Sequence, residues 1–509
     1  MTLAVHPVPL VLPPVAARGQ DDPLAGQWYV RRPDSDGWRA RAEAVRSSMP
    51  GGWLDAILPA IEPRGAAEKR LRAAAARGIV VTTGQQPGLF GGPLYTWLKA
   101  MTARALADEL EERLGIPVAP VFWAATDDSD LAEAIVTTVS VAGGSERIVL
   151  QRTAERDTPL AVIPVGDASD ALEELRAACG SAPNIAILDL VGEAYSPENT
   201  LGGAYVQLLR AVLEPFGVSV LDAAHPATRA AASPVLRTAL QRATTVASMV
   251  QQRSEEIRGM GLRVQVRPVP GRTLVFAVNG EQRRRIPMGE AAALAEQVGT
   301  SELSPNVLLR PVVERSILPT VAYIGGPAEI AYFAQVSAVA EALGVDTPLI
   351  LPRWSGFLIE PHVQRALDTL GVTLEDLRDP HAIESKVARD EVPGDVKEVL
   401  MRARSQAEEL GPRLTDAVRR ADLPLSDAAI AGAGRQLEHK IDRLDRRLVA
   451  AVKRRGSERL QLLATARGAL FPGEVPQERA LNMIPLLARY GSDPLESVLA
   501  SARRYVTGL

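Results

Sequence analysis

GIVVTTGQQPGLFGGPLYTWLKA, residues 78–100, begins as an apolar run, breaks into a loop with four glycines and two glutamines, and restarts behind a proline. The run IVVTT is short and rich in β-branched residues, which is typical of a buried strand. Pro93 suits the first turn of a helix, because its missing N–H would have had no partner there. The stretch therefore predicts a strand, a loop and a helix in direct succession, which is the repeating unit of an α/β fold.

Further strands of the same kind follow along the chain. They are PVAPVFWAATDD (117–128), GVSVLDA (217–223), TVAYIGG (320–326) and TPLILPR (347–353). Short apolar runs separated by helices predict a doubly wound parallel sheet that is covered on both faces. We expect this α/β core to span residues 1–355.

Two segments interrupt the rhythm and are expected to be insertions, at about 133–190 and 261–300. In the second, LRVQVRP (262–268) and RTLVFAVNG (272–280) flank a Pro-Gly turn signal and predict a β-hairpin.

Beyond Ser355 the sequence predicts helices and no clear strand. Apolar residues recur at spacings of three and four in a highly charged segment, at Leu437, Ile441, Leu444, Leu448 and Val452. This pattern predicts a long amphipathic helix of the coiled-coil type. A helical stretch at 393–421 precedes it, so we expect an antiparallel hairpin within residues 356–475 and a last helical segment at 476–509. The apolar seam predicts a homodimer.

Composition narrows the range of functions. The 509 residues are 46% hydrophobic and 23% charged, with a net charge of −4. This balance offers no global basic field, so nucleic acid is not an expected partner. The one cysteine, Cys179, cannot form an internal disulfide, and no apolar run approaches the roughly 20 residues of a membrane span. We expect a cytoplasmic protein without a membrane partner.

Two glycine pairs stand at predicted junctions between a strand and a helix. Gly91 and Gly92 precede Pro93, and the same motif recurs at Gly325 and Gly326. Ligands of open α/β sheets bind at the carboxyl ends of strands, and helix N-termini attract anions. We therefore expect these loops to bind an anionic substrate or a nucleotide; tight turns that need glycine are the alternative. The first loop adds Thr83, Gly84, Gln85, Gln86 and Tyr95 as candidates.

An acidic cluster follows the strand at 117–124. Asp127, Asp128 and Asp130 lie within four residues of one another, and carboxylates this close repel unless a cation or a proton intervenes. They are the candidate catalytic residues, and a substrate amine, a magnesium ion or general-base chemistry would each suit them. The alternative is that Asp128 and Asp130 only cap a helix.

Polar residues also occur within the apolar segment 304–335 and directly after the last strand. These candidates for substrate or nucleotide binding are Asn306, Arg310, Tyr323, Glu329, Arg353 and Ser355. Arg310 needs a carboxylate or phosphate if it is buried, and a structural ion pair with Glu314 is equally compatible. Glu329 could equally serve only to match the dipole of its helix.

Several familiar site motifs are missing from the sequence. There is no Walker A motif, no Gly-x-Gly-x-x-Gly after the first strand, no paired His or Cys metal spacing and no Gly-x-Ser-x-Gly elbow. A ligand-binding or catalytic site of this protein must therefore be built from residues outside these motifs.

Five segments in order resemble the bacillithiol-biosynthesis cysteine ligase family, BshC. They are TTGQQPGLFGGPLYTWLKA, PVAPVFWAATDDSD, YSPENTLGGAYVQLL, SPNVLLRPVVERSILPTVAYIGGPAEIAYFAQ and FPGEVPQERALNMIPLLARYG. The resemblance implies a Rossmann-like core with connecting-peptide insertions and a coiled-coil region that pairs two subunits. It also implies a ligase that joins cysteine to the amine of glucosaminyl malate. ATP is the expected activator, and no permanently bound cofactor is expected.

One position departs from the family pattern. The family has a histidine between the last two acids of the cluster, where this chain has Ser129. Serine cannot become a cation near neutral pH as histidine can. Two other functions therefore stay open at this point: a nucleotidyl or glycosyl transferase on the same scaffold, and a noncatalytic dimeric binding protein.

Overall fold

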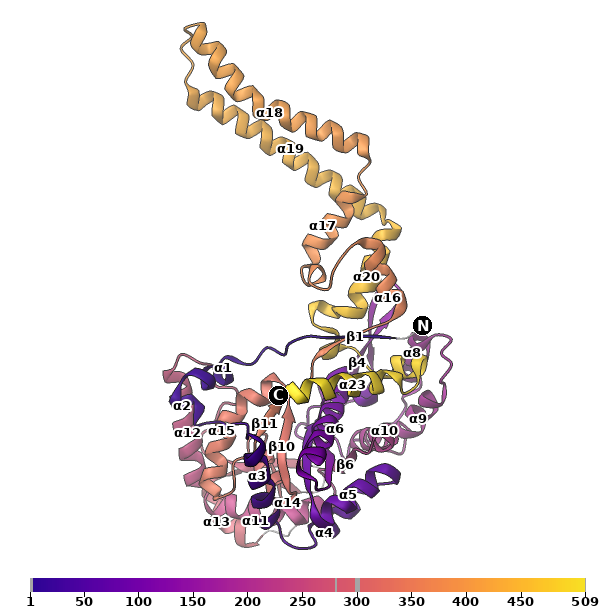
Figure 1. Cartoon of the computed structure of the whole chain (residues 1–509), viewed down its shortest axis with the longest axis vertical. Coiled ribbons are helices and arrows are strands. Elements are labelled where there is room, and N and C mark those ends of the chain that lie inside the picture. The colour runs from indigo at the N-terminus through magenta and orange to yellow at the C-terminus, as the bar shows by residue number, and fades with distance from the viewer. Residues whose placement is uncertain (1–2, 280–281, 298–302, 509) are drawn as a thin grey trace.

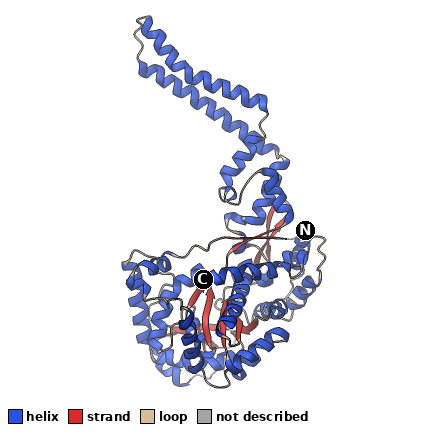
Figure 2. Ribbon diagram, in the orientation of Figure 1, coloured by secondary structure: helices blue, strands red, loops and turns tan. Residues whose placement is uncertain are grey.

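The computed structural model describes residues 3–279, 282–297 and 303–508. A sheet enclosed by helices forms its larger part, and a long helical hairpin projects away from it (Figures 1 and 2). Within the described residues, the central sheet has five parallel strands, in the order β11 (Ile350–Pro352), β10 (Thr320–Gly325), β2 (Ile79–Gln85), β3 (Val118–Ala124) and β6 (Ser219–Asp222). The expected doubly wound parallel sheet is confirmed.

The central strands are apolar because helices cover both faces of the sheet. Every residue of β3 and β10 is buried. One core contains residues of α3 (Ser35–Ser47), α6 (Leu94–Leu114), α10 (Leu201–Leu213) and α23 (Asp493–Gly508). The other contains residues of α4 (Trp53–Ile61), α5 (Gly65–Arg77), α11 (Pro226–Gln241), α12 (Ala243–Gly259), α14 (Arg310–Ile317) and α15 (Pro327–Leu343).

The chain leaves the two neighbouring strands β2 and β10 in opposite directions. After β2 it passes through α6 to β3, and after β10 it passes through α15 to β11 on the other side. Since α6 and α15 belong to different cores, the strand ends of β2 and β10 form the switch point of the sheet. In open α/β sheets this is where a ligand-binding crevice forms.

Two groups of elements lie outside the central sheet. The first follows β3 and consists of α7 (Leu131–Ala134), the hairpin β4 (Val136–Val141) and β5 (Gly144–Val149), α8 (Ser169–Cys179) and α9 (Ala186–Ala194). The second consists of β7 (Arg272–Asn279), β8 (Gln282–Pro287), α13 (Ala291–Gln297) and β9 (Leu303–Pro305), with β7 in the middle of a three-stranded sheet.

In the second group, β7 pairs with other strands than the one expected from the sequence. β7 pairs with β8 and β9, whereas residues 262–268 form no strand. The Gln335 side chain of α15 takes both backbone hydrogen bonds of Val266, at 3.1 and 2.8 Å. Pro268 and Pro270 also lack the N–H groups that a ladder requires. Gly280, in the expected second strand, and residues 298–300 lie outside the described residues.

The prediction of no strand beyond Ser355 is wrong. β12 (Gly356–Ile359) pairs antiparallel with β1 (Ala4–Pro7) from the other end of the chain. Four residues are too few to show a periodicity, and nothing local indicates so distant a partner.

The carboxyl-terminal helices form a stalk and a hairpin. α16 (Pro361–Leu370), α17 (Pro380–Asp390) and α20 (Glu458–Leu470) lie between the α/β body and the long helices α18 (Gly394–Arg420) and α19 (Asp427–Arg455) (Figure 1). Ser426 caps α19 by accepting from the Ala429 amide at 3.3 Å. The expected helical hairpin is confirmed. However, Leu437 and Leu444 of its apolar seam are 38% and 51% exposed, so the hairpin alone does not cover the seam.

Short helices complete the fold. They are α1 (Pro14–Asp21) and α2 (Pro23–Gly26) near the amino terminus, and α21 (Gln477–Ala480) and α22 (Ile484–Tyr490) before the last helix. In the described part of the chain, no helix has both the length and the apolar character needed to cross a membrane.

The loop after β2 is the point where the carboxyl-terminal segment docks. Asn482 is 3% exposed, and its side-chain amide lies 3.1 to 3.3 Å from the carbonyl oxygens of Leu89, Phe90 and Gly92. Tyr195 accepts a hydrogen bond from the Phe90 amide at 2.8 Å. These contacts supply donors and acceptors to a buried loop that has few hydrogen bonds of its own.

We predict that Asn482→Ala destabilises the protein by about 3 kcal/mol, because it leaves buried carbonyl groups without a donor. Chemical denaturation measures the change. Asn279→Ala, at an exposed strand end, is the control and should change stability by less than about 0.5 kcal/mol. Equal effects of the two substitutions would contradict the role assigned to Asn482.

Candidate active site

A cavity of about 480 Å³ lies at the switch point of the sheet. It brings together most of the residues that the sequence indicated. Those that line it are Gly84, Gln85, Gln86, Tyr95, Asp127, Asp128, Asn306, Arg310, Tyr323, Gly326, Glu329 and Arg353.

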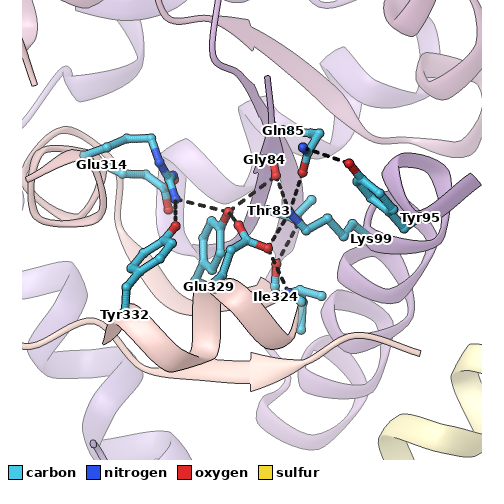
Figure 3. Close-up of polar contacts among 12 residues, drawn as sticks. Thr83, Gly84, Gln85, Tyr95, Lys99, Glu314, Ile324, Glu329 and Tyr332 are labelled. Atoms are coloured by element: carbon cyan, nitrogen blue, oxygen red, sulfur yellow. Dashed lines mark hydrogen bonds and ion pairs between the residues drawn. The ribbon is translucent and has the colours of Figure 1, made fainter. Parts of the chain in front are cut away.

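An ion pair between buried Lys99 and half-buried Glu329 forms the floor of the site. Lys99 is 2% exposed, and its ammonium lies 2.5 Å from the Glu329 carboxylate. It also donates to the Gly84 carbonyl at 2.6 Å and to the Gln85 side chain at 3.0 Å (Figure 3). All three ammonium hydrogens therefore have an acceptor. This saturation makes Lys99 a positioning residue that joins the end of β2 to the start of α15.

Glu329 is held from several sides. It accepts from the Gly326 amide at 2.8 Å and from the Tyr323 hydroxyl at 2.5 Å. Burial opposes its ionisation, but Lys99 and these two donors hold the pKa of the Glu329 carboxyl below its usual range. The first-turn position also suits the dipole of α15.

A second buried layer supports Tyr323. Arg310 donates to the hydroxyl groups of Tyr323 and Tyr332, at 3.2 and 3.3 Å, and lies over the Tyr323 ring. It also donates to Glu314 at 3.0 Å, and the Thr82 hydroxyl donates to the same carboxylate. Burial raises the pKa of Glu314 to about 7, against the attraction of Arg310. The sequence left two partners open for Arg310, a bound anion or Glu314, and the structure contains the ion pair with Glu314.

The acidic cluster divides into three different environments. Asp127 lies 3.6 Å from the Arg283 guanidinium. Asp130 is exposed and caps α7 by accepting from the Glu133 amide at 3.2 Å. Asp128 lines the cavity, and one of its oxygens accepts from the Ser129 amide at 2.6 Å.

The carboxyl group of Asp128 has a shifted pKa. Burial and the charge of Asp127 raise the pKa of Asp128 above its usual range, while Arg283 opposes the shift. Among the described residues, no donor reaches its second carboxylate oxygen. Among the described residues, Asp128 is thus the member of the cluster that lines the cavity without a cationic partner within 4.0 Å, whereas the cap interpretation holds for Asp130. Ser129 does not line this cavity.

The two glutamines at the end of β2, together with Tyr95, form one wall of the cavity. The Gln86 amide donates to Glu133, and Tyr95 lies 3.4 Å from both Gln85 and Glu133. Burial, followed by the charge of Asp130, raises the pKa of Glu133. This wall therefore presents amide and phenol groups to the cavity, with the Glu133 carboxyl group behind them.

The expected anion site at the first glycine pair is corrected by the structure. Gly91 and Gly92 do not line the cavity; both have positive φ, and a Cβ on Gly91 would lie 2.5 Å from the Trp97 ring. The carbonyl of Gly92 faces Asn482, as described above. These glycines are required by a tight buried turn.

The second glycine pair differs in its two members. Gly325 lies outside the cavity, where an added Cβ would meet Ile350 at 2.6 Å. Gly326 lines the cavity, but its amide donates to Glu329. The anion expected at the start of α15 is therefore the carboxylate of the protein itself.

Four more candidates have structural partners. Thr83 lies outside the cavity and donates to the Ile324 carbonyl at 2.8 Å. Arg353 forms a bidentate ion pair with buried Glu478, at 2.8 and 2.5 Å, and Ser355 donates to the same carboxylate at 2.8 Å. Ser355 does not reach the cavity. Asn306 lines it and accepts from the amides of the turn that leads into α14.

Sequence reasoning missed several cavity residues, chiefly Lys99, Phe276, Arg283, Arg285, Tyr332 and Arg479. A lone lysine in the apolar stretch LYTWLKAM is a signal for a buried, paired charge. The run QRRRIP is a second signal, because arginines two apart lie on one face of a strand.

Among the described residues, no group of three or more histidine, cysteine, aspartate or glutamate side chains is arranged to hold a metal ion. Magnesium bound with a nucleotide can rely on one or two carboxylates and the phosphates, so its use stays a prediction.

Two family models match consecutive parts of the chain. Residues 62–354 match the model described as "Bacillithiol biosynthesis BshC, N-terminal Rossmann-like domain", and residues 356–505 match "Bacillithiol biosynthesis BshC, C-terminal coiled-coil domain".

Curated relatives agree with these matches. A protein of Solibacter usitatus is 31% identical over 432 residues, which cover 82% of this chain and 80% of the relative. One of Koribacter versatilis is 32% identical over 451 residues, with 85% and 83% covered, and one of Salinibacter ruber is 30% identical over 449 residues, with 84% and 81% covered. All three bear the name "Putative cysteine ligase BshC". By these matches across most of its length, the chain belongs to the BshC family of bacillithiol biosynthesis.

Proposed function

We propose that this protein is a ligase that joins the carboxyl group of cysteine to the amine of glucosaminyl malate, as the last step of bacillithiol assembly. Family membership supports the reaction class. The single observation that carries the site assignment is Asp128, a half-buried carboxylate that lines the cavity, has a raised pKa and, among the described residues, has no cationic partner within 4.0 Å. An amine attacks only after its ammonium form loses a proton, and a carboxylate of this kind is suited to receive it.

The proposed chemistry uses the residues in distinct roles. The amine nitrogen attacks the activated carboxyl carbon of cysteine, so the C–N bond forms as the bond to the activating group breaks. The proton of the amine passes to Asp128. ATP is the proposed source of activation, because amide formation from a free acid and an amine in water is uphill. The Lys99–Glu329 pair holds the walls of the cavity in place, and Arg283 pairs with Asp127 beside Asp128.

Mass spectrometry of a reaction with cysteine, ATP and glucosaminyl malate tests the assignment. We expect a product whose mass is the sum of the two organic substrates less one water, formed only when ATP is present. Omitting each substrate in turn provides the controls. A folded protein that forms no product with all three compounds would refute the proposed reaction.

Asp128→Asn tests the general base. The substitution keeps the size and a hydrogen-bonding oxygen but removes the charge, so turnover should fall by about 10²-fold with little change in stability. Wild-type turnover should decline as the pH falls through the raised pKa of Asp128, because protonation removes the base. Asp128→Asn should lack this decline.

Asp130→Asn is the matched control for Asp128→Asn, because it keeps the capping oxygen of an exposed aspartate. Its turnover should stay within about twofold of the wild type. Comparable losses in the two variants would contradict the assignment to Asp128.

We further propose that the protein is a homodimer joined through the coiled-coil hairpin. A coiled-coil domain is compatible with oligomerisation. The support is the set of exposed apolar side chains on α18 and α19 and in the connection between them, which includes Val399, Met401, Leu410, Leu414, Leu423, Leu425, Leu437 and Leu444. A second hairpin could cover these residues by knobs-into-holes packing.

Sedimentation velocity should show a dimer at micromolar concentration, and Leu437→Glu with Leu444→Glu should shift it to a monomer without unfolding. Arg446→Glu introduces the same charge 200° away from Leu444 on α19 and should leave the dimer intact. A wild-type monomer at this concentration would refute the dimer.

A further inference from the structure

Cationic side chains that line the cavity fall into two groups. Those with a carboxylate partner within 4.0 Å are Lys99, Arg283, Arg310 and Arg353. Among the described residues, Arg267, Arg285 and Arg479 also line the cavity but have no such partner. The cavity therefore carries positive charge that the protein itself does not neutralise, which is the expected state of a site that awaits an anion.

Among the described residues, Arg285 is the unpaired cation of the cavity that lies over an aromatic ring. It lies on β8 directly opposite Phe276 of β7, and its guanidinium is 4.9 Å from the centre of the Phe276 ring. Arg283, two residues away on the same face of the strand, is 4.0 Å from that centre. Stacking on an aromatic ring holds a guanidinium plane while leaving its N–H groups free to bind.

Arg283 is already committed to protein partners, whereas Arg285 is not. Arg283 donates to the Ser304 hydroxyl at 2.9 Å and to the Pro305 carbonyl, and it pairs with Asp127. Burial and then the neighbouring charge of Arg283 lower the pKa of Arg285. A bound anion would relieve this repulsion, which favours its binding at Arg285.

We propose that Arg285, held by Phe276 beside Arg283, binds a multiply charged anionic group of a substrate, either paired carboxylates or a phosphate. This inference rests on the proposed ligase function for the identity of the substrate. In that reaction the dicarboxylate is the malate moiety of the acceptor, and the phosphates belong to the activating nucleotide. Planar guanidinium groups suit both, because they bind carboxylate and phosphate oxygens bidentately.

The test compares two neighbouring arginines in the full-length protein. Arg284 lies between Arg283 and Arg285 but on the opposite face of β8, where it pairs with Glu290 at 3.0 Å. Arg285→Gln and Arg284→Gln therefore remove the same charge from the same strand. Calorimetric titration with glucosaminyl malate, malate and inorganic pyrophosphate measures binding directly, without turnover.

Arg285→Gln should weaken binding of the responsible anion by about 10-fold to 100-fold, and Arg284→Gln by less than about twofold. Loss confined to glucosaminyl malate and malate identifies the carboxylates as the bound group, and loss confined to pyrophosphate identifies a phosphate. Arg285→Lys should recover only part of the affinity, because it cannot bind bidentately. Unchanged affinity of Arg285→Gln for every probe, or no binding of any probe to the wild type, would overturn the inference.

Steady-state kinetics separates this inference from the proposed function. We expect Arg285→Gln to raise the KM of the affected substrate with little change in kcat, as expected for loss of uniform binding. An active wild type with an unchanged KM in Arg285→Gln would refute the anion site alone. Anion binding that depends on Arg285 in a protein without ligase activity would refute the proposed reaction alone.

Discussion

The ion pair between Lys99 and Glu329 joins the two halves of the α/β body at the point where the site forms. Lys99 belongs to α6 and Glu329 to α15, and these helices cover opposite faces of the sheet. Burying two charges is costly unless further hydrogen bonds complete their shells. Here Gly84, Gly326 and Tyr323 provide them. The pair therefore fixes the width of the crevice, and the Arg310 layer beneath Tyr323 stiffens it.

A second set of contacts ties the carboxyl-terminal segment to the same region. Glu478 binds Arg353 just after β11, and Asn482 binds the loop after β2. These residues lie between the stalk helix α20 and the last helices of the chain. The loop at the start of α6 and the strand end at Arg353 thus depend on a segment more than 100 residues away. The segment that follows the stalk is consequently anchored beside the walls of the cavity.

The sequence predicted the features that depend on local or periodic signals. β2, β3 and β10 are recognisable because burial on both faces makes them continuous apolar runs. The role of Gly91 could not be predicted, because a buried turn and an anion-binding loop require the same glycines. The deciding partner, Asn482, lies about 390 residues further along the chain. Likewise, nothing local pairs β12 with β1 or places Arg285 over the cavity.

The arrangement of charges explains how one cavity can be both rigid and receptive. Lys99, Arg310 and Arg353 each form an ion pair with a carboxylate of the protein, so these cations stabilise the structure and offer little to a substrate. Arg283 pairs with Asp127, so that, among the described residues, Asp128 is the cavity carboxylate without a cation within 4.0 Å. The same Arg283 repels Arg285 across Phe276. A single arginine thereby lies between the carboxylate proposed as proton acceptor and an unneutralised cation, which is the charge pattern that the proposed amine-bearing polyanionic substrate requires.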